Sequence, residues 1–344
     1  LGDALNIFKK AGGWPVLEGK KWKAKNFQWD EAMITIQNLG LNGENFFKIK
    51  EGLDLKNPTQ CIIGLYPYSA EFEPSNESLL KSRNEAYYNL MVDIVVMFGA
   101  KRKSAEREMK DVLNLEISLI KAKTDVDKLD PYKIYNITTI KNLHKRYPYL
   151  HWMDFFKKLY KPDCQIYNDD PVIVQDSRYF DELGKILRTT DKRIIANWMF
   201  WDAAINNLPY ISTQMRRRMD ASGTPPRWQT CISVLTSGDL SLKKVVTLMY
   251  ISKYFDRITK RNVLDITAAI RNEMEKLLST WSWPGISERT RNAAIKKLKA
   301  IEAFVAYPYG LFDNRELSKA YEKVDIIGKR FLKSITELRQ FTFS

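Results

Sequence analysis

GTPPRWQTCISVLTSGDLSLKKVVTLMYISKYF, residues 223–255, is the stretch that decides the fold. A Gly-x-Pro-Pro break leads into Arg227 and Trp228, and Cys231 follows shortly after. Beyond a polar turn, where Asp239 can cap the next helix, the apolar residues keep the spacing of one helix face. They fall at i, i+3, i+4 and i+7: Leu242, Val245, Val246 and Met249. The stretch predicts a loop that enters a core helix, with the tryptophan and the cysteine fixed beside it.

The same helical periodicity recurs from about residue 78 onward. Two long stripes come first: Arg83, Tyr87, Leu90, Met91, Ile94 and Phe98, then Ala105, Met109, Val112, Glu116, Leu119 and Ile120. Further helical stretches are predicted over 191–220, 263–278, 287–305 and 317–338. Pro209 should bend or break the first of these, because proline lacks a backbone N–H. Ser287 can cap the third, and Thr138 or Thr139 can cap a short helix near residue 140.

Strand patterns are few. Residues 46–50 and 60–65 are predicted as strands around a D-L-K-N-P turn at 54–58, and Val172-Ile173-Val174 as a third strand. Residues 1–75 are accordingly expected to be a mixed turn and strand subregion. The predicted fold is mainly α: a large multi-helix domain with a few short β-strands near the N-terminus and around 172–174.

The bulk composition indicates a folded globular protein. The chain has 344 residues, of which 44% are hydrophobic and 12% aromatic, and no apolar run is long enough to span a membrane. The net charge of +14 raises the question of an anionic partner. Its short basic groups lie far apart in sequence, so solvated helix faces are the simplest interpretation, and no nucleic-acid motif is present. These groups are Lys20-Lys21-Trp22-Lys23, Lys101-Arg102-Lys103, Arg216-Arg217-Arg218 and Lys296-Lys297.

No catalytic or metal-binding pattern is visible. The only histidines, His144 and His151, lack the spacing of one helix face, and the sequence contains no H-E-x-x-H. They are interpreted as surface or capping residues. Glu116 lies on an apolar stripe, where a carboxylate is more often a structural acceptor than a catalytic acid. Trp14 is interpreted as a packed anchor.

Several separated motifs carry a resemblance to a known family. The N-terminal ones are G-G-W-P, which contains Gly13, Trp14 and Pro15, and D-L-K-N, which contains Asp54, Lys56 and Asn57. Y-N-x-x-T-I follows at 135–140, P-x-R-W-x-x-C at 225–231 contains Arg227 and Trp228, and T-R-x-x-A-x-x-K-x-x-A-I begins at 290. In this order they resemble the neprilysin/endothelin-converting-enzyme family of zinc metallopeptidases.

This chain departs from the family at two places. Trp201 is followed by Asp202 where the family commonly has Trp-Arg, and residues 281–285 replace a usually acidic segment. The role of the family's arginine is therefore in question here.

The resemblance implies a non-catalytic role. In that family a thermolysin-like domain supplies zinc ligands from an H-E-x-x-H helix, and a large helical domain helps to enclose the substrate cavity. Residues 76–344 resemble this substrate-enclosing domain, and the catalytic zinc domain is absent from the sequence. We therefore expect no enzyme activity, catalytic residue, metal ligand or cofactor in this chain alone, with zinc in a missing catalytic domain. Expected partners are that domain, or another neprilysin-like subunit, and peptide substrates, with no specific nucleic acid.

The compartment is expected to be extracellular or lumenal. The chain begins at Leu1, so we expect a processed or trimmed product with any signal or anchor upstream. Asn76 and Asn136 begin N-x-S/T sequons and are glycosylation candidates. The resemblance implies that Cys231 pairs with a cysteine in a missing upstream segment. Cys61 and Cys164 lie beside short β-like segments, so a disulfide between them and three buried thiols remain alternatives.

A second hypothesis is a complete chain that has lost its catalytic half. It would be a stand-alone secreted pseudo-peptidase that binds a protein or a polyanion. The net positive charge and the departure from the family at Trp201-Asp202 motivate this alternative.

Overall fold

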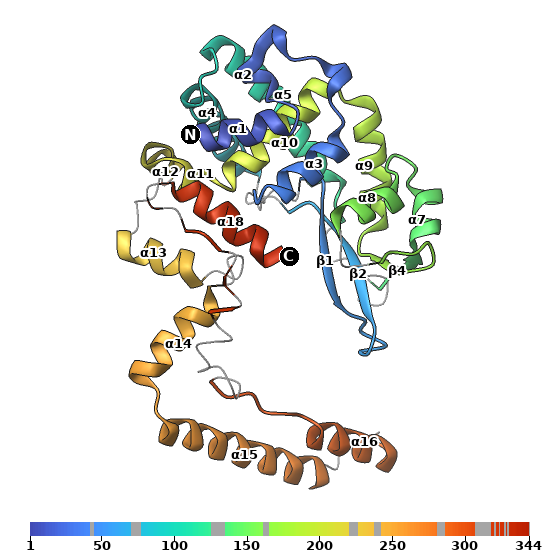
Figure 1. The fold of residues 1–344 in the computed structure, drawn as a ribbon. Helices are drawn as coiled ribbons and strands as arrows, with labels where there is room; N and C mark the ends of the chain where they lie inside the picture. Colours follow the sequence, from blue (N-terminus) through green and yellow to red (C-terminus); the bar gives the residue numbers. More distant parts are fainter. Residues whose placement is uncertain are drawn as a thin grey trace. The chain divides into compact units, whose positions relative to one another are not determined.

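The computed structural model describes the chain except residues 42–44, 70–76, 125–134, 161–164, 220–225, 237–241, 281–285, 307–317, 320, 323, 327, 329 and 344. The protein is mainly α with a small four-stranded sheet, which confirms the predicted fold class (Figure 1). Its chain divides into two compact units. Unit 1 comprises Leu1–Pro225 and Asp325–Ser344, and unit 2 comprises Pro226–Val324. The division into 1–75 and 76–344 stays a prediction.

The helices of unit 1 lie in its N-terminal segment, except α18, which lies in its C-terminal segment. The first group is α1 (Gly2–Lys10), α2 (Pro15–Glu18), α3 (Trp29–Asn38), α4 (Glu77–Met97) and α5 (Arg102–Ala122), with short 3-10 turns at Gly19–Lys21 and Ala24–Asn26. The second group is α7 (Ile140–Arg146), α8 (Trp152–Leu159), α9 (Ser177–Thr189), α10 (Lys192–Ile205), α11 (Leu208–Ile211), α12 (Thr213–Met219) and α18 (Phe331–Phe343). The first 75 residues are more helical than expected, because α1 was not predicted.

The sheet has the strand order β1-β2-β4-β3. Its strands are β1 (Phe47–Leu53), β2 (Cys61–Pro67), β3 (Ile137–Thr139) and β4 (Pro171–Val174). β1 and β2 form the antiparallel hairpin around the D-L-K-N turn, with Leu53 opposite Cys61. β2 also pairs with β4, in parallel, and β3 pairs with β4 in the antiparallel direction at the edge of the sheet. The hairpin and the strand at 172–174 confirm the sequence prediction.

α10 is the central element of unit 1. Every residue from Ile195 to Ile205 is buried, including the polar Asn197 and Asp202, so all sides of this segment face the core. Trp198 packs against Phe46, with ring centroids 4.7 Å apart, and Phe200 packs against Phe8. The helix ends at Ile205, and Pro209 lies in the first turn of α11, where a missing N–H is tolerated. The predicted interruption is thus confirmed.

Side-chain caps fix where several helices begin. Thr139 accepts a hydrogen bond from Asn142 N at the start of α7, which decides between the two predicted threonines. Asp176 and Asp191 cap α9 and α10 in the same way. Ser287 accepts from Thr290 N, as predicted, and begins α16 (Glu288–Lys299) in unit 2.

The C-terminal helix α18 packs closely on the loop after α3. Gly40 has a φ of +75°, and a Cβ there would lie 2.2 Å from the backbone oxygen of Thr336. Arg339 donates to the Asn207 side chain at 2.5 Å and to Gly40 O at 3.4 Å. Gln340 donates to Asn38 O. The predicted single helix over 317–338 is wrong at its centre, since residues 324–326 are not helical and α18 begins at 331.

Unit 2 contains α13 (Arg227–Thr236), α14 (Lys243–Tyr254), α15 (Arg257–Thr280) and α16. Residues 227–236 form a helix, so the predicted loop at this point is wrong. The reason is a stripe at i, i+4 and i+7, formed by Trp228, Ile232 and Leu235, directly after two prolines that suit a helix start.

The predicted core helix is also not buried as expected. Met249 on α14 is 68% exposed and Trp228 is 65% exposed, so neither is a core residue of unit 2. On α15 a continuous apolar stripe is exposed as well: Val263, Ile266, Ile270, Met274 and Leu277. The periodicity identifies the apolar face of each helix correctly, but that face has no full cover within unit 2.

Candidate functional site

The G-G-W-P motif forms a tight loop between α1 and α2. Gly13 has a φ of +80°, and a Cβ there would meet the Glu18 carboxylate, so this position favours glycine. Trp14 is buried and lies against Phe8 and Phe98, with ring centroids 5.2 and 5.4 Å away. Pro15 starts α2. The motif is a packed structural corner and presents no indole surface to a ligand.

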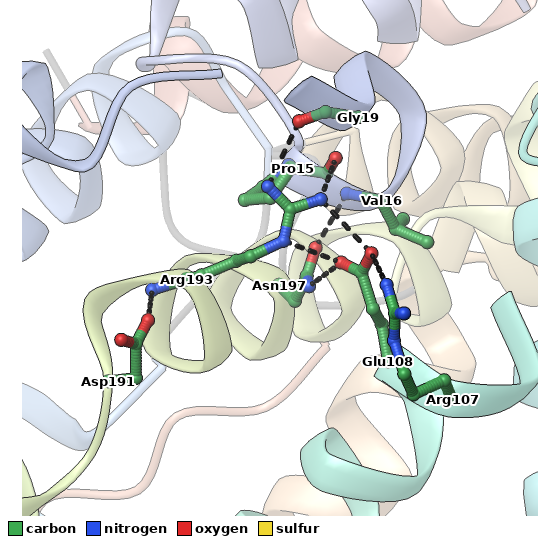
Figure 2. A network of polar contacts seen from close by, with 8 residues as sticks. All are labelled: Pro15, Val16, Gly19, Arg107, Glu108, Asp191, Arg193 and Asn197. Atoms are coloured by element: carbon green, nitrogen blue, oxygen red, sulfur yellow. Dashed lines mark hydrogen bonds and ion pairs between the residues drawn. The ribbon is translucent and has the colours of Figure 1, made fainter. Parts of the chain in front are cut away.

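A polar network holds this corner onto the central helix (Figure 2). Arg193 of α10 donates to Pro15 O at 2.8 Å and to Gly19 O at 3.0 Å. Its guanidinium also forms a two-point ion pair with Glu108 of α5, with both N···O distances 3.0 Å. Such fork-to-fork pairing fixes orientation as well as distance.

Asn197 completes the network one helical turn after Arg193. Its side-chain nitrogen donates to Glu108 at 2.7 Å, and its side-chain oxygen accepts from Val16 N at 2.9 Å. Glu108 is 6% exposed and Asn197 is 1% exposed, so these bonds replace water that the groups would otherwise bind. One arginine, one carboxylate and one amide thus join α2, α5 and α10.

Sequence reasoning missed all three residues of this network. The available signal was Arg193 and Asn197, two polar residues at i and i+4 among the apolar residues of the first half of α10. Glu108 likewise precedes the buried Met109 on α5.

A second buried polar group surrounds Glu116. Tyr68 donates to its carboxylate at 3.0 Å and Tyr87 at 3.4 Å, while Trp201 donates to the Tyr87 hydroxyl at 2.8 Å. Burial raises the pKa of both tyrosines well above the ordinary value, and the nearby carboxylates Glu116 and Asp202 add to this. Glu116 thus accepts hydrogen bonds in the core, as the sequence analysis expected.

Asp202, which follows Trp201 on α10, has its own partners. Its carboxylate accepts from Asn45 at 2.9 Å, and Asn206 donates both to its backbone oxygen at 2.9 Å and to its side chain at 3.3 Å. Asp202 therefore joins the end of α10 to Asn45, two residues before β1.

The D-L-K-N motif is the turn of the β1–β2 hairpin. Asp54 accepts from Lys56 N at 3.0 Å and from the Tyr135 hydroxyl, and Thr59 donates to Asn57. The ammonium group of Lys56 lies 4.5 Å from the centre of the Tyr135 ring. The motif closes the hairpin and attaches it to the segment before β3.

The Asp54 carboxyl gives a pH-dependent prediction. The Tyr135 hydrogen bond, helped by the Lys56 amide, holds the pKa of Asp54 below 3.8. Because folding lowers this pKa, the stabilisation is fully present above the unfolded-state pKa, about 3.8, and is lost as the pH falls through the lower folded-state pKa. We expect Tyr135→Phe to raise the Asp54 pKa toward 3.8, measured by NMR titration of the side-chain carboxyl. Lys56→Gln is the control, since the charge of Lys56 contributes least, and an equal rise in both variants would contradict the assignment.

The remaining predicted site residues are dispersed. Asn136 is half-buried, and its backbone oxygen accepts from Val174 N beside the edge strand β3. Asn76 and Cys164 lie outside the described residues, as does the proposed cap Asp239. Cys61 and Cys231 are exposed free thiols in the described part of the chain, so the buried-thiol alternative does not hold for them. Both disulfide assignments and both glycosylation sites stay predictions.

Two of the predicted basic groups meet in space. Arg102 and Arg218 each bind a different carboxylate oxygen of Asp93 at 2.9 Å, which joins the groups at 101–103 and 216–218. Their distance in sequence therefore does not describe their distance in the fold.

The described residues do not offer a zinc site. No group of three or more His, Cys, Asp or Glu side chains within them is placed to hold a metal ion. The two histidine rings are stacked with centroids 5.6 Å apart, beside Lys141 and Lys145, which is unfavourable for a shared cation. None of the described helices is long and apolar enough to cross a bilayer.

The family model for the N-terminal part of peptidase family M13 matches residues 2–308. The chain belongs to peptidase family M13. Members of this family are zinc-dependent, and the homologues are multi-domain peptidases with a catalytic domain. The predicted family resemblance is confirmed.

Relatives among curated proteins extend well beyond this M13 chain. Neprilysin-2 of Drosophila melanogaster is 30% identical over 97% of the chain, but the chain covers 46% of that protein. Neprilysin-21 of Caenorhabditis elegans is 26% identical, with 42% of it covered. Human endothelin-converting enzyme 1 is 25% identical, with 44% covered. The chain thus spans about half the length of these relatives.

Solved structures show the same fold at low sequence identity. The zinc metalloprotease Zmp1 of Mycobacterium tuberculosis, in complex with an inhibitor, superimposes with a TM-score of 0.75 at 16% identity, over 99% of the M13 chain and 53% of Zmp1. PepO of Lactobacillus rhamnosis gives a TM-score of 0.73 at 15% identity, over 99% and 56% of the two chains.

Proposed function

We propose that this M13 chain is the non-catalytic, substrate-enclosing part of a neprilysin-like zinc metalloendopeptidase. The observation that carries the proposal is the match to the N-terminal family model by a sequence without H-E-x-x-H. Its role is steric: the helices wall a cavity that admits short peptides and excludes folded proteins. A catalytic domain elsewhere in the polypeptide, or in another neprilysin-like subunit, supplies the zinc.

The rigid construction of unit 1 supports this role. A wall that selects substrates by size has to keep its shape, and the Arg193–Glu108–Asn197 network joins three helices through six hydrogen bonds between named atoms. No catalytic residue, metal ligand or cofactor is assigned to the chain itself. We also propose an extracellular or lumenal location, with glycosylation at Asn76 and Asn136.

Two measurements on one preparation test the proposal. The native polypeptide is captured with an antibody to unit 1, and its mass, terminal sequence, zinc content and cleavage of a quenched short peptide are determined. We expect a polypeptide that continues past Ser344 or carries a second subunit, contains zinc and cleaves the peptide but not a folded protein.

The recombinant 344-residue chain is the matched control. Incubated with zinc at equal concentration, it is expected to leave the same peptide intact. Zinc-dependent cleavage by the chain alone would overturn the non-catalytic assignment. A native polypeptide that ends at Ser344, without zinc or a second subunit, would overturn the enclosing role.

The second candidate, a pseudo-peptidase that binds a protein or a polyanion, is favoured by the exposed apolar faces of unit 2. Phe304 is 88% exposed and the α15 stripe is uncovered within that unit. Exposed apolar patches of this kind mark interaction surfaces. The native capture separates the two candidates, because a binding module would be recovered at its own mass with a partner that lacks peptidase activity.

A further inference from the structure

The joint between α7 and α8 contains a hollow of about 260 Å³ on the surface of unit 1. Side chains from three segments line it: Ile140, Lys141, His144, Lys145, His151, Met153, Asp154 and Asn168. Of these residues only Ile140 belongs to a signature motif, Y-N-x-x-T-I at 135–140. The hollow therefore needs an interpretation of its own.

The two histidines are held in a defined arrangement. Nδ1 of His144 lies 3.2 Å from the backbone oxygen of Leu150. A carbonyl oxygen only accepts, so Nδ1 carries the proton and Nε2 is left for a ligand. His151, the residue before α8, stacks on His144 with ring centroids 5.6 Å apart and an interplanar angle of 25°.

The charges around the hollow favour an anion over a cation. Lys141 and Lys145 lie one turn apart on α7, and the ammonium group of neither forms an ion pair within the described part of the chain. Asp154 of α8 is the one carboxylate among the lining residues. Two ammonium groups against one carboxylate leave a positive balance, and each histidine that gains a proton increases it.

The neighbouring charged groups, Asp169, Asp170 and the Arg146–Asp181 ion pair, do not line the hollow. Asp170, in the segment before β4, accepts from Tyr167 N at 2.8 Å, and Asp169 does not line the hollow. Arg146 at the end of α7 binds Asp181 at 3.1 Å. From the third segment, Asn168 adds an amide that donates to oxygen.

We propose that this hollow binds a phosphate or sulfate ester of a small organic group. Lys141, Lys145 and Asn168 hold the ester oxygens, and the histidine pair adds donors when it is protonated. Ile140 is buried and forms an apolar floor together with Met153, which suits the organic part of the ester. The proposal includes stronger binding at lower pH, because a protonated imidazole adds a donor and a positive charge.

Calorimetric titration of the full chain at low ionic strength tests this proposal. Phenyl sulfate is the first probe, because a sulfate monoester keeps one negative charge across the range and any pH dependence then belongs to the protein. We expect saturable binding near pH 5.5 that weakens at least about tenfold near pH 8. Inorganic sulfate, which has no organic group for the floor, is expected to bind more weakly. Phenyl phosphate distinguishes the two ester classes: the tighter of the two esters near pH 8 identifies the class of ligand.

Variants separate a built site from general attraction to a basic protein. Lys141→Gln with Lys145→Gln is expected to weaken binding at least about tenfold at both pH values. His151→Gln, whose side chain makes no cap hydrogen bond, is expected to reduce the pH dependence without unfolding the joint. Lys20→Gln with Lys21→Gln removes the same charge elsewhere on unit 1 and is expected to change nothing. Circular dichroism and the melting temperature verify that each variant is folded.

Three results would overturn the proposal. The first is the absence of saturable phenyl sulfate binding near pH 5.5 up to about 10 mM. The second is an equal weakening of binding by the Lys141/Lys145 double variant and the Lys20/Lys21 double variant, which would show non-specific attraction. The third is an unchanged pH dependence in a folded His151→Gln variant. None of these results bears on the proposed catalytic domain, so the proposed function is tested separately.

Discussion

Arg193→Met is expected to lower the free energy of unfolding of unit 1 by about 3 kcal/mol. The substitution leaves Glu108, whose side chain is 8% exposed, without its two-point cation partner. The cation that remains near Glu108 is the exposed Arg107, whose guanidinium lies 3.6 Å away and makes a single, longer contact. A buried carboxylate that loses its close two-point partner is costly because water does not replace that partner. Pro15 and Gly19 also lose their donor, so the G-G-W-P corner is expected to loosen first. Urea denaturation, followed by the near-ultraviolet signal of the buried tryptophans, measures the change.

The control variants for this prediction come from the same unit. Arg188→Met removes an exposed arginine from the last turn of α9 and is expected to change the free energy of unfolding by less than about 0.5 kcal/mol. The double variant Arg193→Met with Glu108→Met also removes the buried carboxylate and is expected to recover part of the loss. If Arg193→Met were no less stable than Arg188→Met, the network would not anchor the corner.

Gly40→Ala is the second large effect, and we expect it to loosen α18. The added methyl group would lie 2.2 Å from the Thr336 backbone oxygen, and a φ of +75° strains any residue with a Cβ. The helix has to shift, which breaks the bonds of Arg339 to Gly40 O and Asn207. We expect a loss of roughly 2 to 4 kcal/mol in the protection of α18 amides, measured by hydrogen exchange.

Gly52→Ala provides the comparison, because that glycine in β1 has open space around its Cβ position and no positive φ. We expect it to leave the exchange of α18 unchanged. Equal protection of α18 in Gly40→Ala and the wild-type chain would show that the contact at Gly40 does not hold the helix.

Local signals made much of the fold predictable. The β1–β2 hairpin follows from two β-patterned runs around D-L-K-N. Ser287, a good N-cap residue, predicts where α16 begins. Such features depend on residues close together in sequence. Arg193 and Pro15 are 178 positions apart, and their contact follows from how α2 and α10 pack, so no local pattern could reveal it.

Periodicity also had a definite limit in unit 2. The stripe on α15 shows which side of the helix is apolar, yet Ile270 on that stripe is 66% exposed. A helix pattern specifies a face and does not specify what covers it. For the same reason the prediction of a core helix at 242–249 was wrong, although the helix itself exists.

The candidate site was predictable only in part. The signature motifs were found from the sequence, but their function as a corner and a turn became visible only with Arg193 and Tyr135 in place. Of the predicted alternatives, surface or capping, both histidines are exposed, and His151 precedes α8 without a side-chain capping bond. Their stacking across the α7–α8 joint depends on the turn between the two helices, which seven positions of sequence spacing do not encode.

The division of unit 1 into two sequence segments affects how the protein is synthesised. Its last helix emerges from the ribosome about a hundred residues after the rest of its core, because all of unit 2 is translated in between. Until then, the hydrogen bonds from Arg339 to the Asn207 side chain and to Gly40 O cannot form. Joining ends across such a long segment is slow but costs little extra free energy, since each doubling of a loop adds only about 0.6 kcal/mol. Nascent chains stalled before residue 331 should therefore be more sensitive to proteases than released ones.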